Sequence, residues 1–189
     1  MGLRLMSDVV APLEEANDDA LIARWKAGDQ RAATLLVERH SPALARFAVS
    51  LGSLENVEEL VQDTLVRAFE SFDGFRSDSS LRTWLFTILR RLAIDRGRTE
   101  SRRREVGPPE PGQLVTTHGA LDQILADETQ LRIKRVMTSL TRMQREVFGL
   151  RVSEGMSYRE IADVLGTTEG AARVHYHNAL RAVKEELDD

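Results

Sequence analysis

The stretch from Ser157 to Lys184, S-Y-R-E-I-A-D-V-L-G-T-T-E-G-A-A-R-V-H-Y-H-N-A-L-R-A-V-K, decides the fold of the C-terminal part of the chain. Its first part has the i, i+3, i+4, i+7 apolar spacing of a short amphipathic helix, at Tyr158, Ile161, Ala162 and Leu165. Gly166 predicts the end of this helix, and Thr167 or Thr168 can cap a second one. The second helix has its own apolar stripe, formed by Ala172, Tyr176, Ala179 and Val183. Two helices joined by one short turn predict a helix-turn-helix.

The outer face of the second helix carries side chains that suit DNA. In a DNA-binding helix-turn-helix, the second helix lies in the major groove, and residues near its start that lie off the apolar stripe face base edges. Here these residues are Arg173, Val174, His177 and Asn178. Arg and Asn are donors suited to guanine and adenine edges. An ordinary helical hairpin within a bundle is the alternative, since polar outer faces are common on helices.

The composition excludes several classes of protein. Of the 189 residues 42% are hydrophobic, which is enough to fold one or two domains and argues against wholesale disorder. Cys is absent, so disulfides, thiolate catalysis and Cys-ligated zinc are excluded. The sequence has no run of about 18 apolar residues, and its start lacks the apolar centre of a signal peptide. We therefore expect a soluble, cytoplasmic protein without membrane insertion.

The charges are segregated along the chain. A net charge of −4 alone disfavours nucleic acid, because DNA affinity depends on basic side chains. However, the segment from Arg82 to Arg104 holds eight Arg against Asp95 and Glu100, and the next segment, 105–130, holds five acids and no Lys or Arg. A basic block followed by an acidic block suggests separate partners, although a charge run is more often a solvated face.

The first 50 residues predict a flexible lead followed by helices. Residues 1–17 show little periodicity. Asp18 or Asp19 can cap a helix that ends near Gly28, and a further helix begins near Gln30 and continues beyond Pro42. His40 on that helix is expected to be a packing or surface residue, because no second metal ligand follows it at i+4.

The two helices that follow carry opposite charges. The first begins at Asn56 or Ser53, and its outer face bears Glu55, Glu58, Glu59, Gln62 and Asp63. Paired carboxylates could be general acid/base groups, but no neighbouring His or Lys separates their roles, so a protein-docking face is favoured. The second helix follows a turn-rich loop with an exposed Phe75. It is predicted to bury Leu81, Trp84, Leu85, Ile88, Leu92 and Ile94 and to turn Arg82, Arg90, Arg91 and Arg98 outward. A basic helix beside a loop aromatic is suited to single-stranded nucleic acid.

The predicted fold class is all-α, with two helical domains joined by a flexible linker. The segment 102–113 contains G-P-P-E-P-G and predicts a domain boundary. A weak helix is predicted near 120–127, running into 129–140, after which Met143, Val147, Phe148 and Leu150 are predicted to pack against the helix-turn-helix. The predicted division is a lead at 1–17, a first domain at 18–98, a linker at 99–128 and a second domain at 129–189.

The order of these parts resembles the extracytoplasmic-function (ECF) sigma factors of the sigma-70 family, the small two-domain class of bacterial RNA polymerase initiation subunits. E-L-V-Q-D-T-L-V-R-A-F resembles their polymerase-docking helix, F-D-G-F-R-S-D-S-S-L-R-T-W-L-F their minus-ten segment, and S-Y-R-E-I-A-D-V-L-G-T-T-E-G-A-A-R-V their minus-thirty-five reader. The resemblance covers about 19–98 and 131–187. Three motifs in the same order are far more specific than one.

The resemblance implies a set of partners and a role for each motif. The first domain would dock on the clamp of core RNA polymerase through Glu59, Gln62 and Asp63, and would capture the melted minus-ten strand. The minus-ten residues would be Phe75, Arg76, Arg82, Arg90 and Arg91. The second domain would dock on the polymerase flap and read the minus-thirty-five duplex through Thr168, Arg173, Val174, His177, Asn178 and Arg181. Promoter DNA and an anti-sigma factor are the other expected partners. No catalytic residue, metal or cofactor is implied.

Two positions depart from the commonest pattern of that family. Arg91 stands where the family often has Asn beside the flipped-base pocket, and Asn178 stands where it often has Arg in the recognition helix. Both departures concern specificity, so they affect the promoter sequence rather than the function.

Two alternatives were weighed against this interpretation. The terminal segment with V-H-Y-H-N also resembles the LuxR-type helix-turn-helix of dimeric regulators, but those carry an α/β domain upstream, whereas this chain predicts helices. A metalloenzyme would need His175 and His177 with Glu169 or Asp163. Residues two apart on a helix diverge by about 200°, so the two imidazoles cannot share one ion from one helix face.

Overall fold

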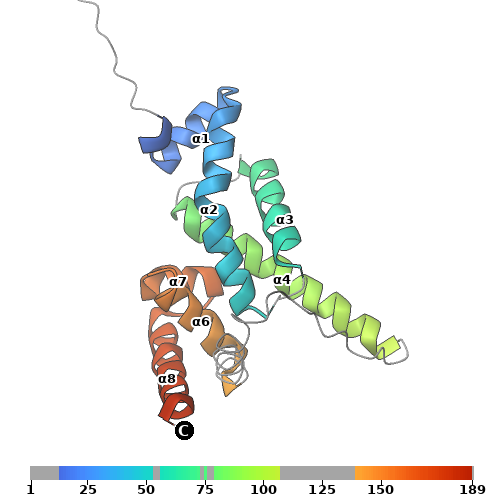
Figure 1. Ribbon diagram of the computed structural model, residues 1–189, viewed down its shortest axis with the longest axis vertical. Coiled ribbons are helices and arrows are strands. Elements are labelled where there is room, and N and C mark those ends of the chain that lie inside the picture. The colour runs from blue at the N-terminus through green and yellow to red at the C-terminus, as the bar shows by residue number, and fades with distance from the viewer. Residues whose placement is uncertain (1–12, 53–55, 73–74, 76–78, 107–138, 189) are drawn as a thin grey trace, which may run out of the picture. The chain divides into compact units, whose positions relative to one another are not determined.

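The structure is a computed structural model, which describes residues 13–52, 56–72, 75, 79–106 and 139–188. In these ranges all regular structure is helical, which confirms the predicted all-α class (Figure 1). A short 3-10 turn, η1, precedes the α-helices; the elements are η1 (Leu13–Glu15), α1 (Asp18–Lys26), α2 (Gln30–Ser50), α3 (Val57–Glu70), α4 (Leu81–Val106), α6 (Arg142–Val152), α7 (Tyr158–Leu165) and α8 (Glu169–Asp188). The chain divides into two compact units, Met1–Pro42 and Ala43–Asp189, and α2 runs through the division.

In the N-terminal unit, Asn17 rather than Asp18 or Asp19 caps α1. The Asn17 side chain accepts a hydrogen bond from the backbone N–H of Ala20 at 2.9 Å. Asp18 is instead committed to α2: its carboxylate accepts from Arg39 Nη1 at 2.8 Å and pairs with His40 Nε2 at 2.9 Å. His40 is 6% exposed, so it is a packing residue, as predicted. No group of three or more potential metal ligands occurs in the described part of the chain.

The Asp18 carboxylate is expected to stabilise the N-terminal unit in a pH-dependent way. The hydrogen bond with His40, helped by Arg39, lowers the pKa of Asp18 below its ordinary value of 3.8. A carboxyl with a lowered folded pKa stabilises the fold above its unfolded pKa and loses this contribution as the pH falls through the folded pKa. Asp18→Asn should therefore lower the free energy of unfolding by about 1 to 2 kcal/mol at pH 7. Measured by urea unfolding, this difference should shrink below pH 3.8.

The matched control is Asp19→Asn, the same change at an exposed neighbour. It should alter the free energy of unfolding by less than about 0.5 kcal/mol at either pH. If the difference between wild type and Asp18→Asn stays constant from pH 7 to the acid limit, the charge of Asp18 does not contribute to stability.

In the C-terminal unit, α3 and α4 pack side by side (Figure 1). The buried residues of α3 are Leu60, Val61, Thr64, Leu65 and Ala68. On α4, Leu81 and Leu85 are buried as predicted, but Trp84, Ile88, Leu92 and Ile94 are only half-buried. Phe86 and Leu89 fill the core in their place. The ring of Phe86 meets Phe47 of α2 edge to face at 5.2 Å, so contact with α2 as well as α3 widens the buried face of α4.

The α4 helix is longer than the sequence pattern predicts. The predicted domain boundary at 102–113 starts inside this helix, because residues 102–106 continue α4 to Val106. The segment before Gly107 and Pro108 is rich in Arg, which is a good helix former, so the helix ends only close to the proline. The weak helix predicted near 120–127, like the rest of 107–138, lies outside the described residues.

The predicted helix-turn-helix is present as α7 and α8. Ser157 caps α7 in a capping box with Glu160, and the Ser157 side-chain hydrogen bond lowers the pKa of Glu160. Gly166 ends α7 in the left-handed conformation, with φ 63°. Thr168 then caps α8 by accepting from the N–H of Ala171 at 3.1 Å. A second capping box, at Thr141 and Gln144, starts α6, which packs against both helices. Of the helices described, none is long and apolar enough to cross a membrane.

Candidate nucleic-acid and polymerase interface

The outer face of α8 presents five of the six side chains predicted to read the minus-thirty-five element. Arg173, Val174, His177, Asn178 and Arg181 are all exposed, while Ala172 and Ala179 on the opposite face are buried. Val174 is 58% exposed, which is unusual for a large apolar residue and leaves its methyl groups available for a thymine methyl. Thr168 is exposed, but its hydroxyl oxygen is used to cap the helix.

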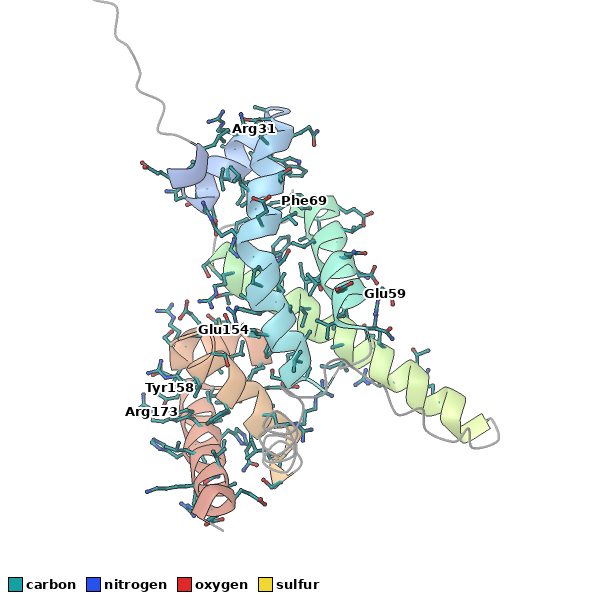
Figure 2. All side chains as sticks on the ribbon, viewed as in Figure 1. Arg31, Glu59, Phe69, Glu154, Tyr158 and Arg173 are labelled. Atoms are coloured by element: carbon teal, nitrogen blue, oxygen red, sulfur yellow. The ribbon has the colours of Figure 1, made fainter. Side chains whose placement is uncertain are left out.

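Arg173 is held in place by neighbours that the sequence did not identify as functional. Its guanidinium lies 5.2 Å from the ring centre of Tyr158, and its Nη2 pairs with Glu169 Oε1 at 2.9 Å (Figure 2). The guanidinium of Arg151 lies 4.8 Å from the same ring. Tyr158 was predicted only as part of the apolar stripe. Its ring is half-buried and leaves room for these two cations, so it links the core of the helix-turn-helix to the outer face.

The acidic face of α3 is exposed as predicted, and a cation from α4 lies across it. The side chains of Glu59 and Asp63 are 64% and 53% exposed, and Gln62 between them is also exposed (Figure 2). Arg96 Nη2 donates to Glu59 Oε1 at 3.2 Å and to Asp63 Oδ2. Val66, one turn further along, is 56% exposed. The face therefore combines partly neutralised carboxylates with an apolar side chain, a mixture typical of protein docking.

The expectation of an exposed Phe75 was wrong. Phe75 is half-buried, with its ring centre 5.0 Å from that of Trp84 and 6.0 Å from that of Phe72. Trp84, expected in the core, is itself half-buried, and its ring is tilted by 43° to that of Phe75. The two aromatics attract one another, and neither is fully covered. Arg76 lies outside the described residues.

A groove of about 340 Å³ opens between the end of α3 and the middle of α4. It is lined by one aromatic ring, two aliphatic chains, two guanidinium groups, a hydroxyl and a carboxylate, from Arg67, Ser71, Trp84, Ile88, Arg91, Leu92 and Asp95. Arg91 is exposed, as predicted. An aromatic wall beside arginine suits an unstacked base with its phosphate.

The prediction that Arg90 turns outward was wrong, and Arg82 is only partly exposed. Arg82 Nη2 binds Glu154 Oε2 at 2.6 Å, and Arg90 Nε binds Glu146 Oε2 at 2.7 Å. Arg46 also binds Glu154, and this hydrogen bond raises the pKa of the Arg46 guanidinium. Both glutamates are buried. These three arginines lie 56 to 108 residues from the glutamates that they bind, so the periodicity of each helix gives no sign of the pairs.

Comparison with known families gives two matches, in the same order as the motifs. Residues 36–103 match the family described as sigma-70 region 2, and residues 130–183 match the family described as sigma-70, region 4. The first match contains α3, the groove and most of α4, and the second contains the helix-turn-helix. The acidic face of α3 and the outer face of α8 therefore fall in different family matches.

Relatives extend the similarity over nearly the whole chain. The chain is 34% identical to RNA polymerase sigma factor NccH of Alcaligenes xylosoxydans xylosoxydans, over 82% of this chain and 86% of NccH. It is 28% identical to the ECF RNA polymerase sigma-E factor of Salmonella typhimurium, over 92% of this chain and 96% of that protein.

Two solved structures are also similar. CnrH, solved in complex with the cytosolic domain of CnrY, shares 31% identity with a TM-score of 0.68 over 90% of this chain and 97% of that chain. The sigma factor RpoE of Bartonella quintana, solved in complex with the anti-sigma factor NepR, shares 31% identity with a TM-score of 0.65 over 85% and 97%. Nothing supports the LuxR-type alternative. The chain belongs to the ECF sigma factors of the sigma-70 family, non-enzymatic subunits that direct RNA polymerase to promoters and initiate transcription.

Proposed function

We propose that this sigma factor uses three separate surfaces: the acidic face of α3 for core polymerase, the groove between α3 and α4 for the minus-ten strand, and the outer face of α8 for the minus-thirty-five duplex. The observation that carries the proposal is the exposed row of polar side chains on the second helix of a helix-turn-helix that matches sigma-70 region 4. We place this sigma factor in the cytoplasm, where the polymerase and the chromosome are.

The domain division supports separate docking of the two modules. We place the first functional domain at 18–98 and the second at 129–189, after a lead at 1–17 and with a linker at 99–128. The first family match runs to residue 103, a few residues into that linker, and the second begins at residue 130, just after it. The first domain docks on the polymerase clamp and the second on the flap, so that both promoter elements are read at once.

At the minus-ten element, the groove supplies the chemistry that one unstacked base needs. Trp84 gives apolar ring surface in the groove, with Phe75 packed beside it, and Arg91 gives donors for a base edge or phosphate. Arg76, Arg82 and Arg90 provide further positive charge along the same segment of chain. Arg91 stands where the family often has Asn, and Arg has only hydrogen-bond donors. It therefore favours a base edge or phosphate that presents acceptors alone.

Reversing one charge on the acidic face should weaken polymerase binding without unfolding the protein. Asp63 is 53% exposed and its partner Arg96 lies at the surface, so Asp63→Lys should change the free energy of unfolding by less than about 1 kcal/mol. The affinity for core RNA polymerase, measured by fluorescence anisotropy, should fall by about tenfold or more, because a like charge opposite a basic docking site is repulsive.

Glu185→Lys is the matched control, since it makes the same charge change at an exposed position of α8, away from the acidic face of α3. Its affinity for core polymerase should equal that of the wild type. Equal affinities for Asp63→Lys and Glu185→Lys would remove the acidic face of α3 from the interface.

We also infer that an anti-sigma factor covers these surfaces when transcription is not required. Both solved relatives named above were determined with a partner protein, RpoE with the anti-sigma factor NepR and CnrH with the cytosolic domain of CnrY. A factor with three exposed functional faces would otherwise compete for polymerase at all times. Purification from the native cell should yield a one-to-one complex with a smaller protein; isolation as a free, fully active factor under all growth conditions would contradict this.

A further inference from the structure

Two glutamate side chains of the C-terminal unit are buried, and each is held by two arginines. Glu154, whose side chain is 1% exposed, accepts from Arg46 Nε at 2.7 Å and Nη2 at 3.0 Å, and from Arg82 Nη2 at 2.6 Å (Figure 2). Glu146, whose side chain is 0% exposed, accepts from Arg90 Nε and from Arg142 Nε, each at 2.7 Å. Every carboxylate oxygen in the pair is therefore matched by a cationic donor.

The pairs follow one antiparallel register. Arg82 and Arg90 are eight residues apart on α4, and their partners Glu154 and Glu146 are also eight residues apart but in the opposite order. Eight residues of helix rise by about 12 Å, so the contacts form a row along α4 rather than a single point. Arg46 joins the row from α2 by sharing Glu154 with Arg82.

The arginines in this row have the chemistry of a phosphate-binding surface. The planar guanidinium fork matches carboxylate and phosphate with the same bidentate geometry, and arginine is the residue that most often exploits it. Arg82 and Arg90 are among the residues proposed above to contact the minus-ten strand. In this structure their guanidinium groups bind carboxylates, whereas contact with the minus-ten strand would require them to bind phosphates.

We propose that Arg46, Arg82 and Arg90 form one phosphate-binding surface for the promoter strand, and that Glu146 and Glu154 occupy this surface in the free factor. The inference rests on the proposed function for Arg82 and Arg90, and it adds Arg46 as a further DNA-binding residue. Binding of DNA and the internal contact exclude each other, because both need the same guanidinium groups.

Two features of the contact fit a reversible occupant. In a buried ion pair, the attraction between the charges does little more than offset the loss of their hydration. Replacing the pair by a hydrated glutamate and an arginine-phosphate contact therefore costs little free energy. The side chains of Arg46 and Arg82 remain 53% and 37% exposed, so the arginine side of the contact can be reached from solvent. A phosphate strand also releases condensed counterions when it binds, which favours the exchange at low salt.

The backbone at this contact is close enough to be tested by a disulfide. A Cβ built on Gly149 of α6 would lie 2.9 Å from Ser50 Oγ and 3.0 Å from Ser50 Cβ of α2. Disulfides have Cβ atoms about 3.8 Å apart, so a Ser50→Cys, Gly149→Cys protein needs a shift of less than about 1 Å. The natural chain has no Cys, so no other thiol can compete.

The experiment compares the oxidised and reduced forms of this double variant. The probe is a fluorescent single-stranded 15-nucleotide DNA of mixed sequence, since phosphate binding does not depend on base order. We expect the oxidised protein to bind at least about tenfold more weakly than the reduced protein, and reductant to restore binding. Equal binding by the two forms would overturn the proposal. So would failure of the disulfide to form, because the internal contact would then not be populated.

A variant that neutralises the two glutamates tests the same contact without a cross-link. Glu146→Gln with Glu154→Gln should bind the probe about tenfold more tightly than the wild type, because the arginines lose their internal anions. Asp19→Asn with Glu38→Gln removes two exposed acids of the N-terminal unit instead and controls for net charge. Circular dichroism should show the same helix content for both. Equal affinities of the two variants would contradict occupation by the glutamates.

Arginine variants separate this proposal from the function on which it rests. Arg46→Ala and Arg82→Ala should each weaken probe binding by the reduced double variant, whereas Arg31→Ala, an exposed arginine at the start of α2, should not (Figure 2). If Arg82→Ala weakens binding but oxidation does not, the DNA role stands and the internal occupation fails. If neither Arg82→Ala nor Arg90→Ala has an effect, the DNA role itself fails. If only Arg46→Ala has no effect, Arg46 is not part of the phosphate-binding surface, and the assignments of Arg82 and Arg90 stand.

Discussion

Replacing Phe75 with Ala is expected to lower open-complex formation by holoenzyme by about tenfold or more. Stacking of an unstacked base on an aromatic ring contributes about 1 to 3 kcal/mol, and Phe75 lies 5.0 Å from Trp84, which lines the groove. The effect would be measured as the fraction of promoter DNA melted, by the fluorescence of 2-aminopurine in the minus-ten strand. Core-polymerase affinity should stay unchanged, because Phe75 lies outside the acidic face of α3.

Two further variants separate stacking from packing. Phe75→Leu keeps an apolar contact with Trp84 but has no ring, so it should melt promoters as poorly as Phe75→Ala while staying as stable as the wild type. Trp84→Ala removes contacts with both Phe72 and Phe75 and should lower the free energy of unfolding by about 3 kcal/mol. A stable Trp84→Ala protein that fails only in melting would show that Trp84, rather than Phe75, is the stacking platform.

Exchanging Asn178 for Arg is expected to change the preferred base at one minus-thirty-five position. An Asn amide pairs in two places with adenine N6 and N7, whereas an Arg guanidinium pairs with guanine O6 and N7. Asn178 is exposed on the outer face of α8, so the wild type should prefer adenine there and Asn178→Arg should prefer guanine. Each bidentate pair discriminates by about 1 to 3 kcal/mol, which is roughly a 5- to 150-fold change in relative promoter use.

The readout is a randomised minus-thirty-five library transcribed by holoenzyme that carries each variant. Arg181→Ala is the comparison, since the loss of a phosphate contact should weaken all promoters alike and flatten the dependence on salt. Arg173 should keep its own base or phosphate, because Tyr158 and Glu169 hold it in place. Identical base preferences for wild type and Asn178→Arg would mean that residue 178 does not reach a base.

The helix-turn-helix could be predicted from sequence because its signals are local. Apolar spacing, the cap at Thr168 and the glycine at 166 each act within a few residues, and all of them have their expected place in the structure. The exposed outer face of α8 follows directly from the same spacing, since the positions off the apolar stripe must face solvent.

The arginine-glutamate row could not be predicted, because it depends on residues that are distant in sequence. Glu154 meets Arg46 across 108 residues, and neither residue interrupts the helical pattern around it. An acid beside Gly155 gives no sign that it is buried. Phe75 was misplaced for a similar reason: a loop aromatic looks exposed until its neighbour Trp84 is known to lie at the surface. The positions of the promoter and polymerase contacts themselves remain predictions.

The central claim, that this protein is a promoter-specific initiation factor of RNA polymerase, is tested most directly by reconstituted transcription. Purified protein and core RNA polymerase from the same cell would be added to a library of genomic promoters, and the transcripts would be sequenced. The account predicts transcripts from a small set of shared start sites only when both proteins are present, and promoter binding only by the complex. Promoter binding by a dimer of this protein alone, with no new transcripts on addition of core polymerase, would contradict it.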